Sequence, residues 1–249
     1  MIESAQRFTV RAADYSQYRE RYDPEILLPR LRAWCGLLPS WLVADIGAGT
    51  GMLADVFLAN GNPVRAVEPN AEMRAACLAL HAGSRLEVFD ARAEATSLPS
   101  QSIDLVCAGR AFHWFDVERS ISEFRRILKP DGWFLSVAFG RAEEGTAANV
   151  EVEAMLRSFS NAGAYDVYAK YARLPECLRR DRHHEEIGGT MRLSKEQFGG
   201  LLRSISTAPP PGDARFVELQ REIDRLFTQH ADGEYIVLAT RYWINVGKL

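Results

Sequence analysis

A glycine-rich stretch and an acid downstream of it are the residues of this 249-residue chain whose types and spacing could do chemistry. Asp45–Gly51 has the sequence DIGAGTG and follows Trp41–Ile46, an apolar run typical of a buried strand. Glycines at a strand-to-helix junction let the backbone approach a ligand, and the next helix offers unbonded N–H groups. Glu68 ends the next apolar run, where its carboxylate can accept hydrogen bonds from both ribose hydroxyls. A glycine loop alone could be a packing turn, but loop and acid together predict an adenosine-bearing cofactor.

The spacing of the glycines indicates which cofactor of this kind is bound. Gly47, Gly49 and Gly51 form a GxGxG pattern rather than GxGxxG, and Asp45 stands two residues before the first glycine. An acid at that position would repel a pyrophosphate and attract an ammonium group. S-adenosylmethionine (SAM) carries an ammonium, a carboxylate and a sulfonium, and it has no phosphate. The residues therefore favour SAM over a nicotinamide dinucleotide.

The elements that must position these residues are short apolar runs alternating with amphipathic segments. Strands are predicted over Trp41–Ile46, Pro63–Glu68, Leu86–Phe89, Ile103–Ala108 and Trp133–Phe139. Helices are predicted over Met52–Asn60, from the N-cap Asn70 towards His81, and from the N-cap Asp116 to Leu128. A turn is predicted over Lys129–Gly132, because proline fixes φ and glycine tolerates positive φ. Strands alternating with helices predict a Rossmann-like parallel sheet covered on both faces.

The second half of the chain is organised differently. Apolar residues recur at helical spacing within Val152–Phe159, Phe198–Leu202 and Phe216–Phe227, which predicts a helical cap over residues 141–230. Aromatic side chains of this cap are expected to line an acceptor pocket: Phe159, Tyr165, Tyr168 and Tyr171. The run Glu234–Val246 is rich in β-branched and aromatic residues and predicts a late strand.

Composition excludes several classes of function. The chain is 47% apolar and 25% charged, which is typical of a globular protein and not of a disordered one. Its net charge of −3 provides no basic field for nucleic acid or anionic lipid, and no apolar run could span a bilayer. The N-terminus does not resemble a signal peptide, and the scattered cysteines favour a reducing cytoplasm: Cys35, Cys77, Cys107 and Cys177. His183–Glu186 lacks the HExxH spacing, so no metal is expected.

The motifs resemble those of the class I SAM-dependent methyltransferases, especially the type 11 group that includes trans-aconitate methyltransferase-like enzymes. Asp45–Gly51 is similar to the family's motif I, and Glu68–Asn70 with Met73 is similar to its acidic ribose motif. The remaining similar stretches are Asp90–Glu94 with Leu98 and Pro99 for the adenine motif, Ala111–Asp116 after the fourth strand, and Arg126–Gly132 before the fifth.

The resemblance also covers the N-terminus and predicts the complete fold. Ala13–Arg19 is similar to the family's lid segment, although Arg19-Glu20 and Tyr22-Asp23 replace the usual Arg-Pro and Tyr-Pro pairs. The family resemblance implies an α/β fold with a Rossmann-like seven-stranded, mostly parallel sheet, helices on both faces and a helical cap. One methyltransferase domain over residues 1–249 is expected. Its parts are lid helices over 1–35, a SAM-binding core over 36–140, the cap, and a terminal strand over 231–249.

The family's cofactor contacts carry over to matching residues of this chain. Those expected to bind SAM are Tyr18, Arg19, Asp45, Gly47, Ala48, Gly49, Thr50, Gly51, Glu68, Pro69, Met73, Asp90, Ala91, Arg110 and Ala111. Asp90 can accept from the adenine amino group, and Ala91 can offer a backbone N–H to the ring. Met73 and Ala91 can sandwich the adenine, or Met73 can be a plain core residue. Tyr15 and Tyr18 can close over the cofactor or pack as part of an amphipathic helix.

His113 is the candidate catalytic residue, since it follows the fourth strand at the sheet edge where such folds bind ligands. It can take a proton from an acceptor hydroxyl or amine, orient the acceptor, or pack between Phe112 and Trp114. A carboxylate acceptor needs no base. The sequence therefore predicts methyl transfer to a carboxylate or hydroxyl, or to an amine, of a small metabolite. The alternatives are a SAM-binding protein without catalysis and a nicotinamide-dependent oxidoreductase; the oligomeric state stays open.

Overall fold

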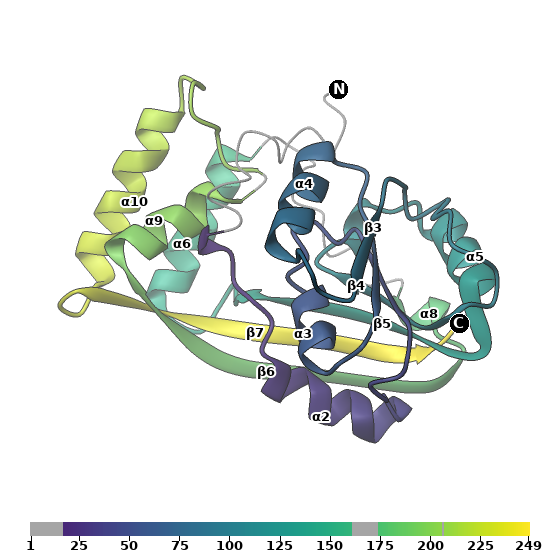
Figure 1. Cartoon of the computed structure of the whole chain (residues 1–249). Coiled ribbons are helices and arrows are strands. Elements are labelled where there is room, and N and C mark those ends of the chain that lie inside the picture. Colours follow the sequence, from purple (N-terminus) through teal and green to yellow (C-terminus); the bar gives the residue numbers. More distant parts are fainter. Residues whose placement is uncertain (1–16, 161–173, 206) are drawn as a thin grey trace. The chain divides into compact units, whose positions relative to one another are not determined.

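The computed structural model describes residues 17–160, 174–205 and 207–249 (Figure 1). The chain divides into two compact units. The core unit comprises Arg21–Ala138, Tyr168–Glu185 and Trp243–Leu249, and the second unit comprises Met1–Glu20, Phe139–Val167 and Glu186–Tyr242. Four tyrosines to which the sequence assigned roles lie outside the described residues: Tyr15, Tyr165, Tyr168 and Tyr171.

The sheet has seven strands, as the resemblance predicted, and their order is β3-β2-β1-β4-β5-β7-β6. Its strands are β1 Val43–Ile46, β2 Val64–Val67, β3 Leu86–Phe89, β4 Ile103–Gly109, β5 Leu128–Arg141, β6 Arg180–Ser194 and β7 Tyr235–Lys248. The pairs β1–β2, β2–β3, β1–β4 and β4–β5 are parallel. The strand order changes direction between β1 and β4. Open α/β sheets bind ligands at such a switch point.

The helices of the core unit are α2 Pro24–Cys35, α3 Ala54–Ala59, α4 Ala71–Leu80, α5 Val117–Ile127 and the short α8 Leu174–Cys177. Several of them begin at a residue whose side chain caps them, as in α2, α4 and α5. The side chains of Asn70 and Asp116 accept from the backbone N–H groups of Met73 and Arg119, so both predicted N-caps are confirmed. Gly61 follows α3 with a φ of 90°, as expected for the end of a helix. No helix of the described ranges has both the length and the apolar character needed to cross a bilayer.

The hydrophobic core of this unit packs α5 and the short 3₁₀ helix Phe112–Trp114 against the sheet. Phe112, Phe124 and Phe134 are all fully buried, and the rings of Phe124 and Phe134 stack with centroids 5.6 Å apart. Phe112 lies 6.1 Å from Phe134 by the same measure. Buried aromatic groups of this size contribute strongly to stability, so they fix the segment that follows β4.

The predicted turn at Lys129–Gly132 is wrong in its geometry. This segment is part of β5, and the register between β4 and β5 shifts there, from Ile103 opposite Leu128 to Leu105 opposite Trp133. Gly132 is not among the glycines at positive φ. Instead, a Cβ at Gly132 would lie 2.8 Å from Cδ2 of Leu128 and 3.2 Å from the carbonyl oxygen of Ile103. Close packing where the register shifts, rather than a left-handed turn, explains the glycine.

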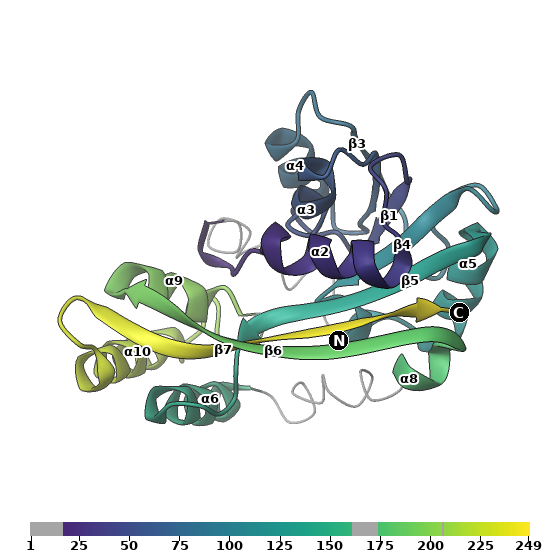
Figure 2. The ribbon, with the colours of Figure 1, turned by 90° about the horizontal axis from the view of Figure 1, so that it is seen from below.

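The region 141–230, predicted as a helical cap, contains a long strand as well as helices. Strand β6 occupies Arg180–Ser194, and its side chains are mostly exposed or half-buried. Arg179 donates its backbone N–H to Lys248, and Arg241 forms an ion pair with Glu186, so residue numbers fall along β7 as they rise along β6. The two strands are antiparallel, and their arrowheads point in opposite directions in Figure 2. An edge strand with few apolar residues has no clear alternating pattern, which is why the sequence did not indicate it.

The second unit has its own hydrophobic core around α6 Ala147–Phe159, α9 Lys195–Arg203 and α10 Phe216–His230. Helix α9 begins with a capping box formed by Ser194 and Gln197. Asn149 of α6 is fully buried. Its amide donates to the carbonyl oxygens of Ala142 and Ala239 at 2.6 and 3.0 Å and accepts from the N–H of Ala239 at 2.8 Å. One side chain thus connects α6 to the segment after β5 and to β7.

Replacing Asn149 with Ala should destabilise the protein by about 2–4 kcal/mol, because buried backbone groups lose their partners. The measurement is urea unfolding followed by circular dichroism. Ser158→Ala in the same helix is the matched control, since the hydroxyl of Ser158 donates to the carbonyl of Met155 within that helix. An unfolding free energy for Asn149→Ala equal to that of the control would contradict the assigned role of the amide.

Candidate functional site

The register of the sheet brings the predicted binding residues to one edge. Ile46 lies opposite Val67, and Val67 lies opposite Phe89, so strands β1, β2 and β3 end side by side. The residues that follow these ends are Gly47, Glu68 and Asp90. Backbone hydrogen bonds continue the pairing there, from the N–H of Gly47 to Val67 and from the N–H of Glu68 to Phe89. The structure therefore brings the glycine loop and both acids together.

The loop Gly47–Gly51 depends on backbone conformations that favour glycine. Gly47, Gly49 and Gly51 have φ values of 68°, 58° and 88°. The N–H groups of Gly47 and Ala48 both donate to the carbonyl of Val67, at 2.8 and 3.2 Å. A further hydrogen bond runs from the N–H of Gly51 to the carbonyl of Ala48, at 2.9 Å. Any residue with a Cβ at the three glycines would strain this turn.

The space around the loop is closed at both ends and open in the middle. A Cβ at Gly47 would lie 2.7 Å from the Cβ of Ala111, and one at Gly51 would clash with the ring of His81. A Cβ at Gly49 would meet no atom within 4 Å among the described residues. The backbone at Gly49 is therefore the part of the loop that a ligand could approach, with Thr50 beside it almost fully buried.

Glu68 holds the loop from the neighbouring strand. Its Oε2 accepts from the N–H of Gly49 and its Oε1 accepts from the N–H of Asn70, both at 2.9 Å. The side chain is buried, with 8% of the residue exposed. Burial raises the pKa of Glu68, and the two N–H donors and Arg74 oppose this shift. The carboxylate thus lies directly beside the open part of the loop, where the sequence predicted a ribose.

Asp45 lies behind the loop, within β1, and is only 1% exposed. Burial raises its pKa to about 7, opposed by a hydrogen bond from the backbone of Ala54. Its Oδ2 has no hydrogen-bond partner among the described residues, and its Oδ1 lies 3.8 Å from the thiol of Cys107. Asp45 is therefore a buried acid with an unpaired oxygen at the base of the loop. Such groups are costly for stability and concentrate at functional sites.

Asp90 is exposed and forms an ion pair with Arg74 at 2.8 Å. The same guanidinium donates to the backbone carbonyl of Glu68 at 3.0 Å, so Arg74 joins the ends of β2 and β3.

The residues predicted to sandwich an adenine ring differ in exposure. Met73 is 3% exposed, which agrees with a core role and leaves little surface for an adenine ring. Ala91 is half-buried and packs against the core, and Pro69 is exposed.

The segment after β4 is conformationally unusual. Arg110 has a φ of 52°, in the left-handed region that costs a non-glycine residue free energy and that clusters at functional sites. Its guanidinium lies 3.6 Å from the sulfur of Met52 and 5.3 Å from the ring centre of Tyr22. Ala111 packs on Gly47. His113 is half-buried, with its ring centre 4.8 Å from that of Trp114.

The two lid residues predicted to contact the cofactor, Tyr18 and Arg19, belong to the second unit. The hydroxyl of Tyr18 donates to Glu196 at 2.7 Å, and its ring fills the space in which a Cβ of Gly200 would lie. Arg19 lies 3.6 Å from the carboxylate of Glu20. Within its unit, Tyr18 therefore packs on α9.

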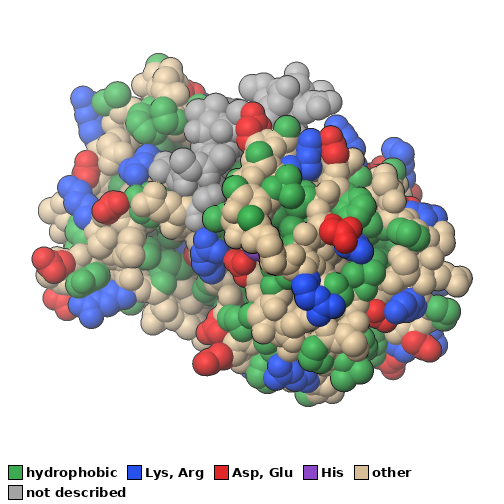
Figure 3. All heavy atoms as spheres, in the orientation of Figure 1, with side chains coloured by type: hydrophobic (Ala, Val, Ile, Leu, Met, Phe, Trp, Pro, Cys, Tyr) green, Lys and Arg blue, Asp and Glu red, His purple; other side chains and the backbone are tan. Residues whose placement is uncertain are grey.

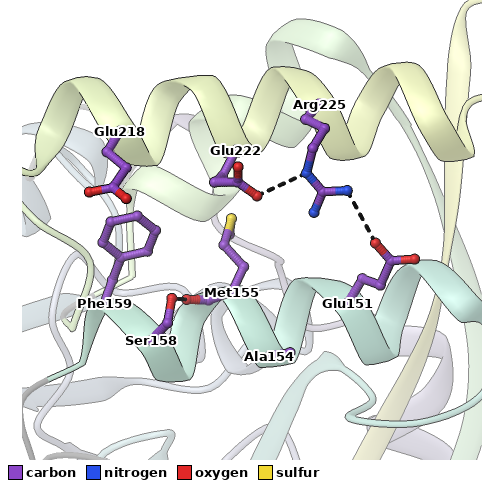
Figure 4. Close-up of a pocket in the computed structure, with 8 residues that line it drawn as sticks. All are labelled: Glu151, Ala154, Met155, Ser158, Phe159, Glu218, Glu222 and Arg225. Carbon is purple, nitrogen blue, oxygen red and sulfur yellow. Dashed lines mark hydrogen bonds and ion pairs between the residues drawn. The ribbon is translucent and has the colours of Figure 1, made fainter.

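A pocket of about 300 Å³ lies between α6 and α10 of the second unit (Figure 4). Phe159, which the sequence predicted to line an acceptor pocket, is one of its lining residues. Arg225 spans the pocket between Glu222 at 2.9 Å and Glu151 at 3.4 Å, and Glu218 lies further along α10. Ion pairs within the protein thus occupy much of its polar wall.

The run His183–Glu186, which lacks a metal-binding spacing, lies on β6, and each of its side chains has a different contact. The ring of His183 stacks on Trp34, and Nδ1 of His184 lies 2.9 Å from Oδ1 of Asn245. The carboxylate of Glu185 accepts two hydrogen bonds from Arg30, and Glu186 pairs with Arg241. The run therefore connects β6 to helix α2 and to strand β7.

Two residues that contact the loop or the acids were missed from the sequence: Arg74 and His81. His81 follows the last turn of α4 and packs against Gly51 and Asp55. Arg74 is the one Lys or Arg residue of α4. Both follow Asn70 at spacings that place them on one side of a helix, which is the signal that could have identified them.

Comparison with known proteins agrees with this geometry. Residues 44–136 match the sequence family of the methyltransferase domain. The chain is 36% identical over 120 residues to an uncharacterized methyltransferase of Mycobacterium tuberculosis, covering 47% of this chain and 46% of that protein. It is 34% identical over 121 residues to the malonyl-[acyl-carrier protein] O-methyltransferase of Methylococcus capsulatus, covering 42% and 39%. The chain thus aligns with about half the length of the curated relatives it matches.

Solved structures share the fold. A candidate type II methyltransferase from Anaeromyxobacter dehalogenans superposes with a TM-score of 0.68 at 22% identity, over 93% of this chain and 98% of the other. The phosphoethanolamine N-methyltransferase 2 of Haemonchus contortus, in complex with S-adenosylhomocysteine, superposes with a TM-score of 0.53 at 14% identity. The superposition covers 99% of this chain and 58% of that one. The [4+2]-cyclase SpnF superposes with a TM-score of 0.54 at 12% identity, over 100% of this chain and 96% of that one.

The buried carboxyl of Asp45 predicts a stability effect that depends on pH. Its folded pKa of about 7 exceeds the ordinary value of 3.8, so its contribution is most favourable below pH 3.8 and is lost as pH rises through 7. Asp45→Asn should therefore stabilise the protein relative to the parent by about 2–3 kcal/mol more at pH 8 than at pH 5.

Urea unfolding at both pH values is the measurement. Asp131→Asn is the control, because the side chain of Asp131 is 92% exposed. A difference between Asp45→Asn and the parent that stays constant from pH 5 to pH 8 would show that Asp45 is not an acid with a raised pKa.

Proposed function

We propose, from the premise that this chain belongs to the class I methyltransferases, that it transfers a methyl group from SAM to a carboxylate or hydroxyl of a small metabolite. SAM is the cofactor of this family. The observation that carries the proposal is the contact between Glu68 and Gly49 at the open part of the loop. It combines a backbone that a ligand can approach with a carboxylate suited to ribose hydroxyls.

The charges of the residues at the sheet edge support SAM as the cofactor. No phosphate is present in SAM, so the buried acids Asp45 and Glu68 would not repel it. Gly47, Ala48, Gly49, Thr50 and Gly51 are assigned to the loop along the cofactor, with the carboxyl of Asp45 behind it. Glu68, with Pro69 following, is assigned to the ribose, Asp90 and Ala91 to the adenine, and Met73 to the floor beside them. Arg110 and Ala111 are assigned to the edge after β4, and Tyr18 and Arg19 to the lid.

When bound, SAM supplies a methyl group that its positive sulfur already activates. The chain's own residues need to align the acceptor, exclude water and, for a hydroxyl, accept a proton. His113 is the candidate for that last task, because Phe112 and Phe115 anchor its 3₁₀ helix in the core at the end of β4. Its contact with Trp114 is equally compatible with orienting the acceptor.

A small acceptor is supported by the charge distribution. The net charge is −3, and acidic and basic side chains are interspersed on the face shown in Figure 3. This provides no extended basic surface for nucleic acid on that face. The O-methyltransferase of Methylococcus capsulatus is a relative that modifies oxygen, in keeping with an oxygen acceptor here. The cysteines carry free thiols, which supports a cytoplasmic location.

A second candidate, binding of SAM without methyl transfer, follows from the likeness to SpnF. This protein is a cyclase with the same fold, so the fold alone does not establish methyl transfer. The two candidates are separated by incubating the protein with radiolabelled SAM and a panel of small carboxylic acids, phenols and amines. Transfer of label supports the first candidate, and binding of SAM without transfer to any acceptor favours the second.

Glu68→Ala should weaken SAM binding by about 1–3 kcal/mol, because the ribose hydroxyls and two backbone N–H groups lose their acceptor. Glu68→Gln should lose less, since its amide oxygen can keep one of these hydrogen bonds. Calorimetric titration with SAM is the measurement, and Glu87→Ala on β3, where the side chain is 62% exposed, is the control. Unchanged affinity in Glu68→Ala would refute the ribose assignment, and NADH binding tighter than SAM would refute the cofactor.

If His113 is a base, His113→Ala should lower turnover by about 10²–10⁴-fold while SAM binding is retained. Activity of the parent should then fall as pH drops through the titration of the histidine, because a protonated ring cannot accept a proton. With a carboxylate acceptor, the loss should be smaller and nearly independent of pH. His113→Gln separates the roles, since glutamine can orient an acceptor but cannot take its proton. Full activity in both variants would place His113 among the packing residues.

A further inference from the structure

His81 lies where the end of α4 meets the glycine loop. Its side chain is 6% exposed, and its ring occupies the space that a Cβ of Gly51 would need. Nε2 lies 2.9 Å from Oδ1 of Asp55, in the first turn of α3. Nδ1 lies 2.7 Å from the backbone carbonyl of Cys77, one turn earlier in α4. The ring therefore bridges two helices directly beneath the loop.

The partners of His81 determine its protonation state. A carbonyl oxygen and a carboxylate can only accept hydrogen bonds, so both ring nitrogens must carry a proton to satisfy them. The position at the carboxyl end of α4 also favours a cation. In agreement, the hydrogen bond to Asp55 is the main cause that raises the pKa of His81 to about 10. Both hydrogen-bond partners of the ring therefore favour the imidazolium ion at neutral pH.

The contacts of Asp55 link this ion to the loop. The backbone N–H of Asp55 donates to the carbonyl of Gly51 at 3.0 Å, which makes the loop continuous with α3. The other carboxylate oxygen of Asp55 accepts from Arg21 at 2.9 Å. A cation on each side therefore fixes the carboxylate of Asp55. Since the backbone of the same residue bonds Gly51, Asp55 connects both ion pairs to the end of the loop.

We propose that His81, as an imidazolium ion, is a positioning residue that holds Gly51 and the start of α3 in the conformation that binds the cofactor. The proposal rests on the proposed function of the loop. The opposite end of the loop is held by Ala111, packed against Gly47, so the two contacts enclose the open backbone at Gly49. His81 itself touches the loop from the side of α4 and needs no contact with SAM.

The proposal predicts a dependence on pH that a neutral packing residue would not show. The charged or titratable groups that face His81 are Asp55 from α3 and Cys77 from its own helix, with Arg21 beyond Asp55 and Asp45 of β1 within electrostatic range. A raised pKa means that the stabilising contact is complete below pH 6.5 and is lost as pH rises through about 10. In Asp55→Asn the imidazolium loses its counter-charge, so its titration should move towards neutral pH.

The test combines hydrogen–deuterium exchange of the amides of Gly51 and Asp55 in the protein without ligand with calorimetric titration of S-adenosylhomocysteine. His81→Gln should speed exchange and weaken binding by about tenfold each, as expected for loss of a charged hydrogen bond. In Asp55→Asn, exchange corrected for the intrinsic rate should rise between pH 6 and 8, where the parent stays constant. His230→Gln is the matched control, because His230 pairs with Glu151 at the end of α10, in the second unit.

Several results would overturn the proposal. These are unchanged exchange and affinity in His81→Gln, a pH-independent loop in Asp55→Asn, or an NMR titration of the parent showing a neutral His81 ring at pH 7. If His81→Gln does not fold, the NMR titration and Asp55→Asn still decide. Failure of the parent to bind S-adenosylhomocysteine would count against the proposed function instead, whereas the exchange and NMR results would still test whether His81 holds the loop.

Discussion

One carboxylate holds the edge of the sheet together. Glu68 accepts from the N–H groups of Gly49 and Asn70, while its own N–H donates to Phe89 and its carbonyl accepts from Arg74. A single residue thereby connects the glycine loop, the end of β3 and the first turns of α4. Because the loop is short and rich in glycine, it has little rigidity of its own. Its shape depends on this acceptor being fixed by the strand that carries it.

This arrangement has a cost in stability that the rest of the fold must offset. Burial raises the pKa of both Glu68 and Asp45, which means that the folded chain holds their charges less readily than water does. The cost is opposed by backbone hydrogen bonds and by the aromatic core around Phe124 and Phe134. A positively charged ligand at the proposed SAM site would lower this cost, because it would stabilise the ionised form of both carboxyls.

Much of the core unit could be predicted from the sequence because its signals are local. Strand β3 has the predicted bounds, and Asn70 and Asp116 cap helices as their residue types indicate. Strand β6 could not be predicted, since its residues are polar and it is fixed by distant contacts such as that of Glu185 with Arg30. Gly132 was found, but for the wrong reason. The packing of Leu128 against Gly132 at the register shift could not be inferred from the sequence, because glycine after proline and aspartate is also typical of a turn.

The candidate site shows the same division between local and distant information. The glycines and Glu68 were found because a short motif fixes their places at strand ends. Arg74 and His81 were missed because they act from α4, which returns across these ends only in the folded chain. Yet Asn70, Arg74, Cys77 and His81 recur at helical spacing and share one face of that helix. Polar groups on this face need partners, and here Glu68 and Asp90 provide those of Arg74, whereas Asp55 of α3 provides one for His81.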